Sequence, residues 1–157
     1  MTFLFQECMV SYSFTGADIG NSQTFQVNNF VNNAAIVEPR IAREFTIDLQ
    51  DILLNQTSLS IVTNSGDLVY EGEIVQYYVS PITATSNSSA AQNRLTIAIN
   101  VRFFNTQDPE KDFEERFSFY YDYNGNAQLI GSQLDDALEV IFERITQDIF
   151  NKSLANW

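Results

Sequence analysis

The chain has no histidine and a single cysteine among its 157 residues, which excludes several kinds of site. Catalytic triads with a histidine base, disulfides within the chain and cysteine–histidine zinc sites are not available to it. Basic residues are also scarce, with eight lysines and arginines against twenty acidic residues. The resulting net charge of −12 argues against nucleic acid as a partner, because phosphate backbones are bound through clusters of Lys and Arg.

Long apolar runs are missing as well: no segment approaches the roughly 18 consecutive apolar residues that span a bilayer. What the chain has is a globular composition, with 45% hydrophobic residues and 13 phenylalanines. Such a composition excludes wholesale disorder and provides for a core of one domain. Nothing in the sequence predicts a cofactor or a metal.

The clearest pattern lies between Asn93 and Asn105. Its apolar residues occupy every second position, and they are Leu95, Ile97, Ile99, Val101 and Phe103. Successive side chains of a strand point to opposite faces, so these five form one apolar face opposite a mixed, partly charged one. This alternation predicts a strand of an antiparallel sheet that is covered on one side only.

Two helices and several further strands are predicted around it. Apolar residues at helical spacing indicate helices over residues 38–55 and 132–152, the second opening with a capping box at Ser132 and Asp135. Strands are expected at 24–30, 59–62, 68–80 and 113–123, with mixed faces in 68–80. We therefore predict an α+β two-layer sandwich, in which two helices cover one face of a four- to five-stranded, mostly antiparallel sheet (β-α-β-β-β-α). Residues 1–22 are expected to form an N-terminal arm and 23–157 a single domain.

Several short segments, taken in order, resemble the LPS-assembly lipoprotein family LptE, in particular its Bacteroidota branch. The resemblance covers essentially the whole chain and depends on the ordered set of segments. They are Cys8 with Tyr12-Ser13-Phe14-Thr15-Gly16-Ala17, Asp67-Leu68 with Glu71-Gly72-Glu73-Ile74, Tyr77-Tyr78-Val79-Ser80-Pro81, Asn93-Arg94-Leu95-Thr96-Ile97, Asn105-Thr106 with Asp108-Pro109, and Asp148-Ile149-Phe150-Asn151-Lys152 with Asn156-Trp157.

The resemblance implies a non-catalytic protein of the Gram-negative outer membrane, on its periplasmic side. Members of the family are anchored by an acylated N-terminal cysteine, sit as a plug in the lumen of the LptD β-barrel, help that barrel fold and assist lipopolysaccharide transfer to the surface. It therefore predicts an LptD-like barrel as partner, lipopolysaccharide as a possible ligand and Cys8 as the lipidation site. Glu7 departs from the small residue expected before the lipidated cysteine, and no export signal precedes it in this sequence. The alternative is that Cys8 is a small buried or idle thiol.

Arg102 and Arg116 are candidates for binding lipopolysaccharide. If Asn105 pairs with Phe113 across the turn, the two arginines lie directly opposite each other, which is unfavourable unless an anion compensates them. A phosphate of lipid A or of the core sugars could be that anion. The alternative is that Glu114, Glu71 or Glu73 neutralises them.

Four aromatic residues are predicted to bind the partner from the uncovered side of the sheet, namely Phe104, Tyr120, Tyr70 and Tyr78, because exposed aromatic patches mark interfaces. A second functional class is a periplasm-facing lipoprotein adaptor for another outer-membrane or envelope protein. A third is a hydrolase that uses Glu71 and Glu73, whose carboxylates share a strand face about 6.5–7 Å apart. A deep pocket around the two glutamates would be needed for the hydrolase.

Overall fold

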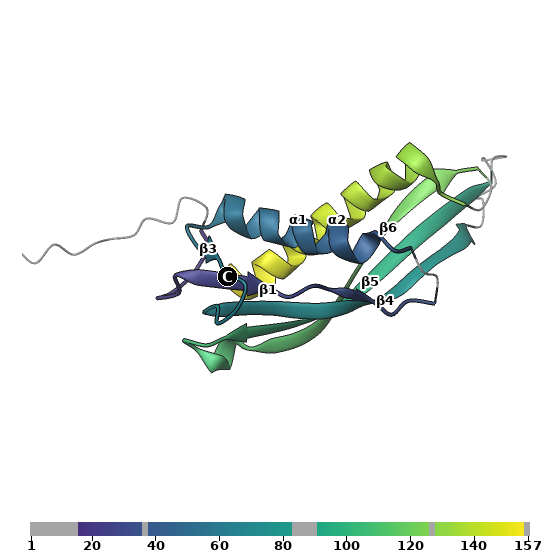
Figure 1. Ribbon diagram of the computed structural model, residues 1–157. Coiled ribbons are helices and arrows are strands. Elements are labelled where there is room, and N and C mark those ends of the chain that lie inside the picture. The colour runs from purple at the N-terminus through teal and green to yellow at the C-terminus, as the bar shows by residue number, and fades with distance from the viewer. Residues whose placement is uncertain (1–15, 36–37, 83–90, 126–127, 156–157) are drawn as a thin grey trace, which may run out of the picture.

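Two helices cover one face of a six-stranded sheet in the computed structural model, which describes residues 16–35, 38–82, 91–125 and 128–155 (Figure 1). Helix α1 spans Ile41–Gln56 and helix α2 spans Gly131–Leu154. The strands are β1 (Thr24–Val27), β2 (Val31–Asn32), β3 (Ser60–Ile61), β4 (Leu68–Ile82), β5 (Gln92–Asn105) and β6 (Phe113–Asn124), with a short 3-10 helix η1 at Pro109–Lys111. The predicted fold class is confirmed. Cys8 and most of the segment between β4 and β5 lie outside the described residues.

The sheet is mixed, with strand order β3-β1-β4-β5-β6. The long strands β4, β5 and β6 pair antiparallel, as the alternating pattern predicts. The short strands pair parallel: β1 with β3 and β4, and β2 with β4. The sequence pattern cannot show β2, because two residues are too few for any periodicity.

Both helices bury the stripes that their spacing predicts. In α1 the stripe includes Ile41, Phe45, Leu49 and Leu53, all fully buried. In α2 it runs from Leu134 through Ile141 to Ile149. The predicted capping box is wrong, however: α2 begins at Gly131 after Ile130, without a side-chain cap, and Asp135 instead forms a 2.7 Å ion pair with Arg40 of the segment before α1. No helix in the described part of the chain is long and apolar enough to cross a membrane.

The core lies between the helices and the face of the sheet that they cover, which we call the covered face. All five apolar residues of the β5 pattern are fully buried there. Tyr70 of β4 joins them, with its ring centroid 4.9 Å from that of Phe103 and its hydroxyl 2.9 Å from Ser153 Oγ of α2. Gly72 also lies on this face, where a Cβ atom would collide with the Asn100 carbonyl oxygen and the Phe30 ring.

A β-bulge in β4 decides which side chains reach the core. Ile74 pairs with Ile99 and Gln76 with Ala98, so Val75 is the extra residue on β4. One extra residue reverses the alternation of faces along the strand. Even-numbered residues up to Ile74 are therefore buried under the helices, whereas Tyr77 and Val79 take that place after the bulge. The bulge explains why both faces of this strand look mixed in the sequence.

Candidate docking face of the sheet

The side chains of β4, β5 and β6 that point away from both helices form what we call the open face. Paired positions run across the three strands in rows, for example Tyr78, Thr96 and Tyr120. Figure 1 shows both helices on the opposite side of these strands. The open face is thus a broad sheet surface without a covering layer among the described residues.

Exposed aromatic side chains stand near both ends of the open face. Tyr78 and Tyr120 flank Thr96 and are 45% and 43% exposed. Phe104, 40% exposed, lies beside Val69 eight residues along β5, roughly 26 Å away at the usual rise per residue. These three residues take the positions that the sequence predicts. Tyr70 does not, and that part of the prediction is wrong: Tyr70 precedes the bulge, is fully buried, and its burial raises the pKa of its hydroxyl.

A cation sits on one of these rings. The guanidinium carbon of Arg94 lies 3.8 Å from the centroid of the Tyr120 ring. The same guanidinium donates hydrogen bonds of 2.7 and 2.9 Å to the two carboxylate oxygens of Asp122, the residue directly opposite on β6. These hydrogen bonds lower the pKa of Asp122 and raise that of Arg94. This cluster is not predicted from the sequence, because the alternation of the two strands reveals it only once their register is known.

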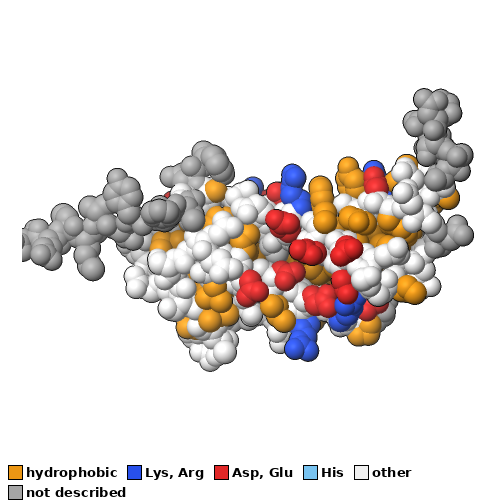
Figure 2. All heavy atoms as spheres, turned by 90° about the horizontal axis from the view of Figure 1, so that it is seen from above, with side chains coloured by type: hydrophobic (Ala, Val, Ile, Leu, Met, Phe, Trp, Pro, Cys, Tyr) orange, Lys and Arg blue, Asp and Glu red, His pale blue; other side chains and the backbone are white. Residues whose placement is uncertain are grey.

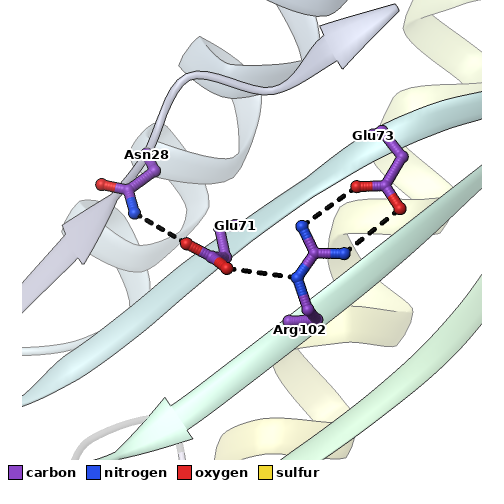
Figure 3. Close-up of polar contacts among 4 residues, drawn as sticks. All are labelled: Asn28, Glu71, Glu73 and Arg102. Atoms are coloured by element: carbon purple, nitrogen blue, oxygen red, sulfur yellow. Dashed lines mark hydrogen bonds and ion pairs between the residues drawn. The ribbon is translucent and has the colours of Figure 1, made fainter. Parts of the chain in front are cut away.

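An ionic network centred on Arg102 lies next to the Phe104 end of the open face (Figure 3). Its guanidinium donates hydrogen bonds of 3.2 and 3.0 Å to Glu73 and of 3.1 Å to Glu71. Asn28, which follows β1, donates a 3.0 Å hydrogen bond to the other oxygen of Glu71. The two hydrogen bonds to Glu73, followed by the one to Glu71, raise the pKa of Arg102 further above its ordinary value. Of the two alternatives for Arg102, neutralisation by Glu71 and Glu73 is the one confirmed.

The predicted opposition of Arg102 and Arg116 is wrong. Phe103, not Asn105, pairs with Phe113, so Arg102 lies opposite Glu114 and Arg116 lies opposite Asn100. Two side chains of the turn cause the shift: Asn105 accepts hydrogen bonds from the backbone N–H groups of Gln107 and Asp108, and Asp112 accepts one from Asn105. Arg116 remains exposed on the open face, where it donates a 2.6 Å hydrogen bond to the neutral Gln76 side chain.

The helix side of the molecule differs in charge. Figure 2 shows acidic side chains gathered over the helices. Asp48 and Asp51 of α1 line a groove there together with Glu139 and Glu143 of α2. Desolvation, followed by the repulsion of Asp51, Glu44 and Glu139, raises the pKa of Asp48 to about 6. No group of three or more acids or cysteines in the described residues is arranged to hold a metal ion.

Comparisons with known proteins agree with this architecture. The family model described as "LptE: Lipopolysaccharide-assembly" matches residues 22–153, which confirms the resemblance drawn from the short segments. No curated protein matches the chain.

Three solved structures have a similar fold. A hypothetical protein from Chlamydia trachomatis has a TM-score of 0.55 at 11% identity, with 86% of this chain and 99% of the other covered. A putative neuraminyllactose-binding hemagglutinin homolog from Helicobacter pylori has a TM-score of 0.54 at 9% identity, with 87% and 88% covered. A minor lipoprotein from Acinetobacter baumannii has a TM-score of 0.50 at 8% identity, with 85% and 95% covered. At such low identities the likeness concerns the fold alone.

Proposed function

Because the chain belongs to the LptE lipopolysaccharide-assembly family, we propose that it is a non-catalytic subunit of an outer-membrane lipopolysaccharide translocon, plugging the lumen of an LptD-like barrel and helping it assemble. In this proposal Cys8 carries a lipid that holds the protein on the periplasmic side of the outer membrane. One acyl chain gives only marginal membrane binding, so docking in the barrel supplies the second attachment.

The open face is the observation that best supports docking. It combines exposed aromatic side chains near both ends with ion pairs that are already satisfied within the chain. Tyrosine is enriched among the few residues that carry most of the binding energy of protein interfaces, while satisfied ion pairs can be covered at a lower desolvation cost than free charges. A broad sheet surface with these properties suits contact with the inner wall of a larger protein. Glu71 and Glu73 both accept hydrogen bonds from Arg102, which weighs against the hydrolase alternative.

Co-purification with the barrel tests this assignment. The full chain is expected to form a stoichiometric, detergent-stable complex with a barrel of LptD size. The double variant Tyr78→Glu, Tyr120→Glu should weaken the complex at least tenfold, because it places two charges in the buried contact. The matched control is Ile47→Glu, Val140→Glu on the helices, where both residues are 41% exposed. An intact complex in the tyrosine variant, or equal loss in the helix variant, would contradict docking through the open face.

The same purification distinguishes the proposed function from the second candidate, an adaptor for another envelope protein. Capture of a different stoichiometric partner, with normal surface lipopolysaccharide after depletion of the protein, would favour the adaptor. Loss of surface lipopolysaccharide together with capture of the barrel favours the translocon.

We also propose that the protein contacts lipopolysaccharide directly. The hydrogen-bond partners of the two candidate arginines favour Arg116 over Arg102 for this contact. Arg102 is neutralised by two carboxylates, whereas the hydrogen-bond partner of Arg116 is a neutral amide. Arg116→Glu should therefore reduce lipopolysaccharide binding more than Arg102→Glu does. Unchanged binding in the double variant Arg102→Glu, Arg116→Glu would exclude both residues.

A further inference from the structure

Strand β6 ends the sheet and leaves a long free edge. It is 12 residues long, and within the described part of the chain only β5 pairs with it. An edge strand of this length presents a row of N–H and C=O groups to which another strand can add. Charged side chains at Glu114, Glu115, Arg116 and Asp122 restrict which strands fit it.

The hydrogen-bond pattern shows which residues direct their backbone groups outward. The amide of Gly125 donates to the carbonyl of Ala91, which continues the β5–β6 ladder at a pair of odd-numbered residues. Hydrogen-bonded and non-hydrogen-bonded pairs alternate in an antiparallel ladder. The odd-numbered residues of β6 therefore bond to β5, and the even-numbered residues direct their N–H and C=O groups toward the free edge.

We propose that this edge pairs antiparallel with β6 of a second copy of the chain, about a two-fold axis at Phe119. In this register the even-numbered residues form the hydrogen-bonded pairs, which the outward groups require. Phe119 meets its own counterpart, and Phe117 meets Tyr121 of the second copy. The two sheets join into one continuous sheet, with about twelve hydrogen bonds across the junction. This contact is independent of any barrel and goes beyond the proposed function.

Charge complementarity favours this register over its neighbours. Arg116 lies opposite Asp122 of the second copy, twice by symmetry, and Asp122 already bonds to Arg94 within its own chain. Each Asp122 carboxylate then stands in a row between two arginines on the open face. Glu114 lies opposite Asn124 of the second copy, and Glu115 lies opposite its Tyr123. No two residues of like charge are therefore paired directly.

Neighbouring registers that keep the hydrogen-bond pattern differ by two in the sum of paired residue numbers. One places Glu114 opposite Asp122, a like-charge pair. The other moves Arg116 opposite Asn124 and loses both ion pairs. Self-complementarity thus selects a single register, which is the reason to commit to a second copy as the occupant.

Cysteine cross-linking tests the register in the full-length Cys8→Ser chain. Phe119→Cys should form a covalent dimer on mild oxidation, because non-hydrogen-bonded partners have Cα atoms about 4.5 Å apart, within disulfide reach. Tyr121→Cys is the matched control, since its two copies would be offset by four residues, roughly 13 Å along the strands. We expect cross-linking at least ten times faster for Phe119→Cys. Equal rates, or faster reaction of Tyr121→Cys, would overturn the proposal.

Sedimentation of the Cys8→Ser chain without further substitution provides a second measurement. At about 100 µM protein and physiological ionic strength, where the Debye length is about 8 Å, the repulsion between two copies of charge −12 is largely screened. A dimer is expected, and Ser118→Pro should convert it to a monomer that keeps its circular-dichroism spectrum. Proline removes only an outward N–H at this position and is tolerated on edge strands. A monomer at every concentration without Ser118→Pro would refute the pairing and leave the edge to another strand.

Discussion

Phe103 and Phe104 are neighbours on β5, yet Phe103 is fully buried under the helices while Phe104 is 40% exposed on the open face. A similar division holds for most side chains of β4 and β5. The covered face is closed by apolar contacts, and its Tyr70 hydroxyl finds a partner in Ser153 of α2. On the open face the charged groups satisfy one another through Arg94–Asp122 and Arg102–Glu73 pairs. We therefore expect substitutions on the covered face to affect stability more than substitutions on the open face.

The largest expected difference between the two faces comes from shortening these adjacent phenylalanines. Phe103→Ala should lower the free energy of unfolding by about 3–5 kcal/mol, because it leaves a cavity beside Tyr70 and Phe113. Phe104→Ala should cost less than about 1 kcal/mol, since its side chain is already partly in water. Urea denaturation of both variants measures the contrast. Similar losses would mean that the open face is as much a core as the covered one.

Removing the hydroxyl group from Tyr70 or from Tyr78, both on β4, compares the two faces by the loss of a single oxygen atom. Tyr70→Phe should cost about 1 kcal/mol, the net value of the buried hydrogen bond to Ser153. Tyr78→Phe, beyond the bulge and 45% exposed, should stay within about 0.5 kcal/mol of the wild type. Thermal or urea denaturation distinguishes them. A larger loss for Tyr78→Phe would place the reversal of faces somewhere other than Val75.

These residues also show how far the sequence predicts the structure. The helices and the β5 face are evident because hydrophobic burial imposes a regular period over many residues. The position of Tyr70 cannot be read, because the bulge at Val75 depends on the pairing with β5 and has no signature of its own in the chain. The predicted register between β5 and β6, which places Arg102 opposite Arg116, is wrong for a similar reason. Hydrogen bonds of the Asn105 and Asp112 side chains determine the turn between these strands. Phe104 and Tyr120 are exposed as predicted because β5 and β6 pair without a bulge, whereas the bulge in β4 puts Tyr70 and Tyr78 on opposite faces.

Charge gives a third contrast, between paired acids of the open face and crowded acids of the helices. Asp122 has a lowered pKa beside Arg94, whereas the pKa of Asp48 is raised to about 6 by desolvation and by acidic neighbours. A raised pKa means that the folded state binds the proton more tightly than the unfolded state between about pH 4 and 6. The Asp48 contribution to stability is thus fully present below about pH 4 and is lost as the pH rises through 6.

Asp48→Asn should therefore stabilise the protein at pH 7.5 and have almost no effect at pH 3.5. We expect a gain of about 0.5–1 kcal/mol, because the half-exposed carboxylate is screened by solvent. Unfolding measured across this pH range provides the test, with Asp122→Asn as the control. Since Arg94 stabilises the ionised form of Asp122, that variant should lose stability at pH 7.5. If the gain in stability from Asp48→Asn did not vary with pH, it would not arise from the raised pKa of Asp48.

The smallest effect on stability is expected for the ion pair between Arg102 and Glu73 on the open face. Arg102 and Glu73 form a two-pronged ion pair, with side chains 30% and 18% exposed. Solvent screening and the entropy of fixing two long side chains offset most of its attraction. A double-mutant cycle with Arg102→Met and Glu73→Gln should give a coupling energy of about 0.5 kcal/mol at 0.15 M salt and less at 1 M. A coupling of several kcal/mol would show that this network supports the fold. A small coupling energy would agree with the proposal that the open face is a docking surface.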